Sequence, residues 1–413
     1  MTPDGPWSGS PSTAEIALDD RAYAAWSAIA LHRPVGPRSF GVKDVIDVEG
    51  MPTACGFEPW RDRAAAEDAA VVRRLRTRGW DPVGKTHTAQ FAYADPPPTL
   101  NPTDPSRTPG GSSTGSAVAV ARGHVPMALG TQTGGSTIRP AAYCGVVGMK
   151  PSFGILPVDG IHPVSPSLDT VGIIAATTSI AAEAAHALGA IDDAGLGTAR
   201  AAQTPATVAM FDDADSLLED AAAEAAWQHV TTALTDGIVT RTTSFPAVDL
   251  ARVIQLHIEL MAIEAWPYHA DLAAAAEASY YGPKMRRLLE IGRELAPTTP
   301  PEERLVPLRS ELDGLARAVP DDGVLLMPAT VGSPPARIGT GSSRLCMPWT
   351  VLGRPVVVVP WCVTLPDGST EVGGVQVVGQ HGADDVVLAV AAVVEDRLRS
   401  AGLAPNATAA PQG

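Results

Sequence analysis

The sequence predicts an α/β fold, in which short buried strands alternate with helices. Short apolar runs rich in β-branched residues, such as VVVV at Val356–Val359, indicate buried strands. The segment from Asp213 to Pro320 instead carries alanine, leucine and glutamate at helical spacing. The 413 residues are 45% hydrophobic and 18% charged, a composition that buries a large core. We therefore expect one compact domain over residues 1–413.

The N-terminal part of the chain predicts alternating helices and strands. Residues 13–31 are rich in alanine and predict a helix. The segment SFGVKDVIDVEGMPT, residues 39–53, predicts one or two short strands, which puts Lys43 at a strand end. In EDAAVVRRLRTRG, residues 67–79, apolar side chains share one helical face and Gly79 is placed to end the helix. A short strand ending near Gly84 follows.

The remaining elements complete the α/β pattern. The proline-rich residues 94–110 predict a surface loop, and residues 117–130 predict a helix followed by a short strand. Residues 384–400 predict a closing helix, and residues 401–413 a frayed tail. The domain thus divides into a core over about 36–190, a helical variable segment over about 213–320, and a C-terminal return to the sheet over about 323–400.

Charge and apolar pattern exclude several classes of partner. The formal net charge of −15 and the pI of about 5.0 disfavour nucleic acid and anionic lipid surfaces. Membrane-spanning helices need about 18 consecutive apolar residues, and the chain has no such run. The N-terminal residues MTPDGPWSGS lack the basic and apolar regions of a signal peptide. We expect a cytoplasmic protein with no membrane or nucleic-acid partner, and a homodimer stays open.

Cysteine and histidine patterns give no sign of a metal or cofactor. The four cysteines are scattered without a CxxC pair, so neither a zinc site nor a disulfide framework is predicted. His257 and His269 fall in a helical stretch without the i, i+4 spacing of a metal pair. We therefore predict no metal and no cofactor.

Lysine usage singles out one residue. The 30 basic residues include only four lysines, so the chain uses arginine for nearly all of its positive charge. Arginine stays protonated in proteins, whereas a buried lysine can lose its proton and act as a base. Lys43 is therefore an informative residue.

Three stretches of small residues carry the chemistry. They are GVKD at Gly41–Asp44, PGGSSTGS at Pro109–Ser116 and GTQTGGSTIRP at Gly130–Pro140. A serine hydroxyl needs an adjacent base and donors aimed at the developing oxyanion. Here Lys43 supplies a base and Ser112 a proton relay.

These stretches resemble, in order and spacing, the amidase signature family, whose Ser-cisSer-Lys triad cleaves amide bonds. The resemblance implies Lys43 as base, Ser112 as relay and Ser136 as nucleophile, with the two serines 24 residues apart. It implies an oxyanion hole in the backbone of Thr133, Gly134, Gly135 and Ser136. It also implies a central mixed β-sheet flanked by helices on both faces.

The resemblance extends over most of the chain. It continues through CGVVGMKPSFG at Cys144–Gly154 and SLDTVG at Ser167–Gly172, and resumes at LLMPAT, LGRPVVVVP and GGVQVVG towards the C-terminus. By the same resemblance, Arg139 braces the loop after the nucleophile. One position departs from many members, which carry an acidic residue where this chain has Gln132.

Lys43 must be held neutral to act as a base near pH 7. The apolar neighbours Val42, Val45 and Ile46 are consistent with the necessary loss of solvent. Asp44 and Asp47 would oppose this if they faced the amine, so we expect both to point elsewhere.

The function implied is hydrolysis of a small or medium carboxylic amide, or of a urea- or carbamate-like C–N bond, through a Ser136 acyl-enzyme. One alternative is acyl or ammonia transfer, in the manner of an amidotransferase. Another, from a different class, is a binding or scaffold protein without activity. The aromatic candidates for the substrate pocket are Tyr93, Tyr143, Trp266 and Trp349, with Tyr268 and Trp361 as further members.

Two other motifs point to different chemistry. GWDPVGKT at Gly79–Thr86 matches the phosphate-binding G-x-x-x-x-G-K-T pattern, but a helix precedes it where the mechanism needs a buried strand. GSSTG at Gly111–Gly115 matches a nucleophile elbow centred on Ser113, yet a proline-rich loop precedes it instead of a strand. We therefore expect Ser113 to hydrogen-bond the backbone of its loop.

Overall fold

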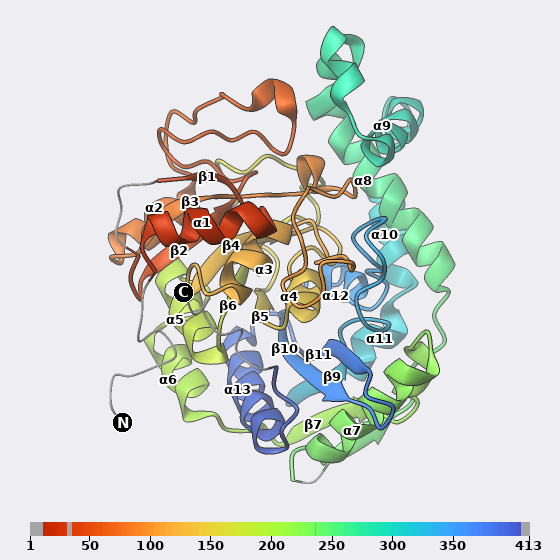
Figure 1. Cartoon of the computed structure of the whole chain (residues 1–413). Helices are drawn as coiled ribbons and strands as arrows, with labels where there is room; N and C mark the ends of the chain where they lie inside the picture. Colours follow the sequence, from red (N-terminus) through yellow and green to blue (C-terminus); the bar gives the residue numbers. More distant parts are fainter. Residues whose placement is uncertain (1–10, 31–34, 236, 406–413) are drawn as a thin grey trace.

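The computed structural model describes residues 11–30, 35–235 and 237–405, which form an 11-stranded mixed β-sheet with surrounding helices (Figure 1). The strand order is β1-β3-β2-β4-β6-β5-β10-β11-β9-β7-β8. Strand β2 runs parallel to β3 and β4, and β7 parallel to β8 and β9, whereas the other neighbours are antiparallel. The strands are β1 (Trp26–Ile29), β2 (Ser39–Lys43), β3 (Asp81–Thr86), β4 (Met127–Gln132), β5 (Val147–Lys150), β6 (Thr170–Ala175), β7 (Thr207–Phe211), β8 (Arg241–Thr243), β9 (Gly323–Pro328), β10 (Val356–Thr364) and β11 (Thr370–Gly379).

Helices cover both faces of this sheet. Side chains alternate between the faces of a strand, so Gly374 and Gly379 of β11, five residues apart, face opposite sides. A β-carbon on Gly374 would meet Ala142 of α4, and one on Gly379 would meet Val387 of α13. The α/β fold with a mixed sheet between helices is therefore confirmed.

The helices follow the chain between the strands. Figure 1 shows α5, α6 and α13 gathered beside the middle of the sheet, with α8 to α11 along another side. The α-helices are α1 (Thr13–Tyr23), α2 (Ala70–Thr77), α3 (Thr114–Ala121), α4 (Ile138–Cys144), α5 (Thr178–Leu188), α6 (Asp193–Ala201), α7 (Ala221–Thr235), α8 (Leu250–Ala274), α9 (Pro283–Leu295), α10 (Glu302–Ser310), α11 (Asp313–Ala318), α12 (Met347–Val351) and α13 (Asp384–Ser400). No helix in the described ranges is long and apolar enough to cross a membrane.

Most predicted elements are found, with two differences. Helices α7 to α11 lie in the predicted helical segment, but the short strand β8 lies among them and was not predicted. The helix predicted over residues 13–31 ends at Tyr23, where Ala24 takes a left-handed backbone with φ of 49°. Residues Trp26–Ile29 instead add strand β1 to the edge of the sheet beside β3. The helix prediction was wrong for the second half of residues 13–31, because pairing at the sheet edge outweighed the helix propensity of its alanines.

The ends of β2, β3 and β4 set the position of the candidate site. Lys43 is the last residue of β2, and β4 leads directly into the segment that starts at Thr133. The GKT residues of the phosphate-binding pattern lie inside β3, where Lys85 is fully buried. A strand at this position offers no cradle of backbone N–H groups for a phosphate. The described part of the predicted tail ends at residue 405, and residues 406–413 lie outside the described ranges.

Candidate active site

Lys43 lies within hydrogen-bond distance of the first serine motif. Its Nζ is 2.8 Å from Ser112 Oγ and 2.7 Å from Thr131 Oγ1. The neighbouring Asp44 points away from this amine, towards Lys85 Nζ at 3.6 Å, and accepts hydrogen bonds from backbone N–H groups after β2. Among the described residues, Lys43 therefore has hydroxyl partners and no carboxylate within salt-bridge distance.

Burial lowers the pKa of Lys43 from 10.5 to about 7. The side chain has no exposed surface, so its charged form loses the solvent that normally stabilises it. The negative charge of the Asp169 carboxylate acts in the opposite direction, but burial is the larger cause. A substantial fraction of the amine is thus neutral near pH 7.

The loop that carries Ser112 is fixed by its backbone. The Gly111–Ser112 peptide bond is cis, and Ser112 C=O accepts hydrogen bonds from Ala89 N–H and Thr88 Oγ1. Arg139, which is buried, donates to Gly111 C=O at 2.5 Å and to Thr340 Oγ1 at 3.1 Å. Arg139 therefore braces the serine loop.

The neighbouring Ser113 is engaged in holding two loops together. Its N–H donates to Ser136 C=O at 3.1 Å, which brings the two serine motifs side by side. Its Oγ donates to Thr131 C=O and accepts from Thr131 N–H. A hydroxyl occupied in this way matches the expected backbone role of Ser113 and leaves it poorly placed as a nucleophile.

In the described part of the chain, the backbone N–H groups of Thr133–Ser136 have no hydrogen-bond partner; these four residues are called the oxyanion segment below, after the predicted oxyanion hole. Among the residues that the structure describes, none accepts a hydrogen bond from these four N–H groups. Buried N–H groups are almost always paired, so four consecutive unpaired donors indicate a site for an anion or a polarised oxygen.

The carbonyl groups of the same segment are all occupied. Thr133 C=O accepts from His257 Nε2 at 2.9 Å, and Gly134 C=O accepts from Thr350 Oγ1 at 2.7 Å. The carbonyls of the last two residues accept from the N–H groups of Arg139 and Ser113. Because the C=O and the next N–H of a trans peptide point in opposite directions, these contacts hold the N–H groups on the other side.

Ser136 is more exposed than the other two residues of the predicted triad. It is partly exposed, whereas Lys43 and Ser112 are fully buried. No hydrogen bond joins Ser136 Oγ to another described residue. In the described ranges Ser136 Oγ thus makes no hydrogen bond with Ser112, and its part as the nucleophile stays a prediction.

Gln132 performs a role that needs both halves of an amide. Its Oε1 accepts from the N–H groups of Thr137 and Ile138 at 2.8 and 3.0 Å, and its Nε2 donates to Thr350 Oγ1 at 3.0 Å. A carboxylate at this position accepts hydrogen bonds but donates none. The departure from the acidic residue thus fits the local contacts of this chain.

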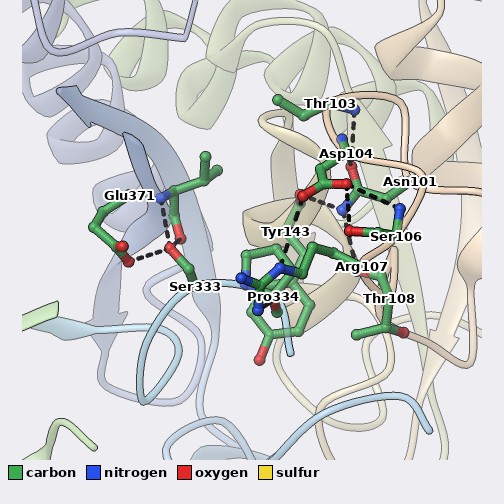
Figure 2. Close-up of polar contacts among 11 residues, drawn as sticks. Asn101, Thr103, Asp104, Ser106, Arg107, Thr108, Tyr143, Ser333, Pro334 and Glu371 are labelled. Atoms are coloured by element: carbon green, nitrogen blue, oxygen red, sulfur yellow. Dashed lines mark hydrogen bonds and ion pairs between the residues drawn. The ribbon is translucent and has the colours of Figure 1, made fainter. Parts of the chain in front are cut away.

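The proline-rich loop, which leads into the serine motif, contacts the loop that contains Ser333 and Pro334. The proline-rich loop is tied internally by Asn101 and Asp104, and Arg107 Nη1 donates to Pro334 C=O at 3.4 Å (Figure 2). The facing loop is fastened to β11 by hydrogen bonds of Ser333 with Glu371 and Val372 (Figure 2). The chain after Pro334 then passes Arg139 at Thr340 and continues to Ser343 beside the oxyanion segment.

The predicted aromatic residues of the pocket differ in accessibility. Trp349 is 0% and Tyr143 is 1% exposed, so both pack beneath the site in this conformation and burial favours a core role for them. Trp361, at 5%, is also buried. Tyr93 and Trp266 are partly buried, and their role as pocket walls stays a prediction.

Ser343, which was not predicted as a pocket residue, lies beside the oxyanion segment. Ser343 is partly exposed, and a β-carbon on Gly135 would come within 3.0 Å of its Cβ.

Within the described ranges, no group of three His, Cys, Asp or Glu side chains is arranged to hold a metal ion.

Sequence reasoning missed the side chains that hydrogen-bond to the predicted site residues and fix their positions. Thr131 accepts a hydrogen bond from Lys43. The side chains of Thr350 and His257 donate to carbonyl groups of the oxyanion segment. Asp169 accepts a hydrogen bond from Thr133 Oγ1 at 2.5 Å. Asp169 stands in the SLDTVG match and Thr131 two residues before Thr133, so both carried a weak signal. His257 lies more than 120 residues away along the chain and carried none.

Comparison with known proteins shows which proteins this chain resembles. A family model described as amidase matches residues 39–234. A solved structure described as an amidase has 27% identity and a TM-score of 0.78, covering 93% of this chain and 94% of that one. The chain is similar to the amidase signature family in these matched residues and in its fold. A 6-aminohexanoate cyclic dimer hydrolase, at 18% identity and a TM-score of 0.77, shares the fold over 97% of this chain and 94% of its own.

A curated relative is similar over a shorter stretch. A glutamyl-tRNA(Gln) amidotransferase subunit from Treponema pallidum (strain Nichols) is 48% identical over 149 residues, which are 35% of this chain and 29% of that protein. The match thus spans less than a third of that relative. Both amidases and amidotransferase subunits are therefore among the proteins that this chain resembles.

Proposed function

We propose that this protein is an amidohydrolase that cleaves the C–N bond of a small or medium carboxylic amide through an acyl-enzyme on Ser136. The observation that carries the proposal is the hydrogen bond between Lys43 and Ser112, made by a lysine whose pKa burial lowers to about 7. Such a lysine is able to accept a proton at neutral pH, which an exposed lysine is not.

The proton path runs from the nucleophile to the buried amine. Neutral Lys43 accepts the proton of Ser112 Oγ, and Ser112 accepts that of Ser136 as Ser136 Oγ bonds to the substrate carbonyl carbon. The carbonyl oxygen gains the negative charge, which the N–H groups of Thr133–Ser136 stabilise. As the C–N bond breaks, the proton returns along the same path to the leaving nitrogen. Water then repeats the sequence on the acyl-enzyme and releases the acid.

The experiment is intact-mass analysis after exposure to a fluorophosphonate. Wild type is expected to gain one phosphonyl group at Ser136, and Ser136→Ala none. Lys43→Ala and Ser112→Ala are expected to label at least about 100-fold more slowly, because the hydroxyl loses its proton path. Ser113→Ala is the matched control and is expected to label at the wild-type site. Unmodified wild type, or equal labelling of Ser136→Ala at one site, would overturn the assignment.

Acyl transfer is the second candidate, favoured by the 48% identity to an amidotransferase subunit over the matched stretch. An amide panel with ammonia detection separates the two. Hydrolysis predicts that the chain alone releases ammonia and free acid. Transfer predicts that release stays slow until an acceptor amine or a partner protein is added.

A further inference from the structure

His257 approaches the oxyanion segment from a helix outside the matched family model. It lies on α8, in the helical variable segment, whereas the model covers residues 39–234 (Figure 1). The side chain is 5% exposed, and its Nε2 is 2.9 Å from Thr133 C=O. A β-carbon on Gly134 would come within 3.2 Å of His257 Cε1, so the ring lies directly against that glycine.

The hydrogen-bond role of His257 is determined by its partner. A carbonyl oxygen only accepts, so Nε2 carries the hydrogen. Burial lowers the pKa of His257 to about 4, and the ring is therefore neutral at pH 7. A neutral ring holds the carbonyl without adding a positive charge to the buried site.

The consequence for the oxyanion segment follows from peptide geometry. Thr133 C=O and Gly134 N–H belong to one planar unit and point in opposite directions. Fixing the oxygen on the His257 side therefore directs the Gly134 N–H to the opposite side. Without this contact, the peptide plane next to a flexible glycine is free to rotate.

A second set of contacts joins α8 to the same residue. Glu264 accepts hydrogen bonds from Ser165 Oγ and from Ser167, in the loop before β6. Ser165 N–H in turn donates to Asp169, which accepts from Thr133 Oγ1 at 2.5 Å. Helix α8 thus holds the backbone of Thr133 through His257 and its side chain through this loop.

We propose that His257 is a positioning residue of the oxyanion hole, which orients the Gly134 N–H by donating a hydrogen bond to Thr133 C=O. The inference rests on the proposed amidohydrolase function. It gives the variable segment a part in transition-state stabilisation in addition to any contact with substrate.

The test compares donor-free and donor-retaining substitutions of His257. His257→Phe keeps a flat ring but removes the donor, and His257→Gln keeps an N–H at similar reach. His269→Phe is the matched control, because His269 is a buried histidine on the same helix whose Nδ1 contacts Tyr281 instead. The readouts are the rate of fluorophosphonate labelling at Ser136, kcat and KM on an active amide, and the melting temperature.

Misorienting a donor costs less than removing it, which typically costs about 100-fold to 1,000-fold in rate. For His257→Phe we expect labelling and kcat to fall about 10-fold with KM changed less than about 2-fold, since the contact acts on the transition state. His257→Gln is expected to recover most of the rate, and His269→Phe to stay within about 2-fold of wild type. If Phe lowers the melting temperature, His257→Leu serves as the second donor-free variant.

Three results would decide against His257. Wild-type labelling by the donor-free variants overturns the inference, as does an equal loss in His269→Phe, which would assign the effect to the packing of α8. A His257→Gln variant as slow as His257→Phe also overturns it. Failure of wild type itself to label at Ser136 is a different outcome, because it overturns the proposed function first.

Discussion

Replacing Lys43 by methionine is expected to stabilise the fold while it abolishes activity. A base held neutral by burial is costly at every pH where the unfolded chain would carry the charge. Burial lowers the pKa of Lys43 from 10.5 to about 7, so the folded state binds fewer protons than the unfolded state between these values. The free energy of unfolding therefore rises with pH between about 7 and about 10.5. The full destabilisation by the buried lysine is present below pH 7.

The magnitude follows from the two pKa values. Their difference corresponds to about 5 kcal/mol of destabilisation at pH 6. At pH 9 the folded amine is neutral and the unfolded amine is still charged, which leaves about 2 kcal/mol. Methionine does not titrate and forfeits the contacts with Ser112 and Thr131, worth about 1 kcal/mol each. Lys43→Met should therefore be about 3 kcal/mol more stable than wild type at pH 6 and nearly equal to it at pH 9.

The assay is urea unfolding of both proteins at pH 6, 7.5 and 9, with the difference in unfolding free energy plotted against pH. Other titrating groups are common to both proteins and cancel to first order. The labelling rate of wild type should also rise with pH through an inflection near 7, where Lys43 becomes neutral. A stability difference that stays constant from pH 6 to 9, together with no such inflection, would refute the lowered pKa.

Two further predictions test the surroundings of the site. Gly135→Ala would bring a β-carbon within 3.1 Å of Cys346 Cβ, and we expect at least about a 100-fold loss of kcat, measured by ammonia release, because the oxyanion donors shift. Wild-type kcat in that variant would contradict the crowding argument. Lys85→Met leaves Asp44 buried without its cation, and chemical denaturation should show a loss of about 3 to 5 kcal/mol. Adding Asp44→Asn should recover part of that loss; additive losses would show that the pair is not coupled.

Local pattern was sufficient for the parts of the molecule that depend on neighbours in sequence. Helix α2 follows from its apolar face, and the strand at Val356–Val359 from its β-branched run. The placement of Lys43 at a strand end follows from the glycine and proline after it. The helix prediction for residues 13–31 was partly wrong because a helix and a strand are both locally acceptable in its second half. Only pairing with β3 selects the strand at Trp26–Ile29.

The candidate site divides in the same way. The three motifs place Lys43, Ser112 and Ser136 in the chain, and their residue types already indicate a base, a relay and a nucleophile. The lowering of the Lys43 pKa to about 7 depends on complete burial, which no local pattern determines. The orientation of the free N–H groups depends on His257 and Thr350, which meet the segment only when α8 and α12 pack against it.

The sequence by itself thus determined the α/β class and indicated which side chains to propose as reacting groups, because side-chain chemistry and short-range periodicity are properties of the residues themselves. Only the tertiary structure decided the burial of Lys43, which lowers its pKa, and the direction of the free N–H groups of Thr133–Ser136. Both depend on solvent exclusion and on hydrogen bonds between segments far apart in the chain, and these exist only after the chain has packed.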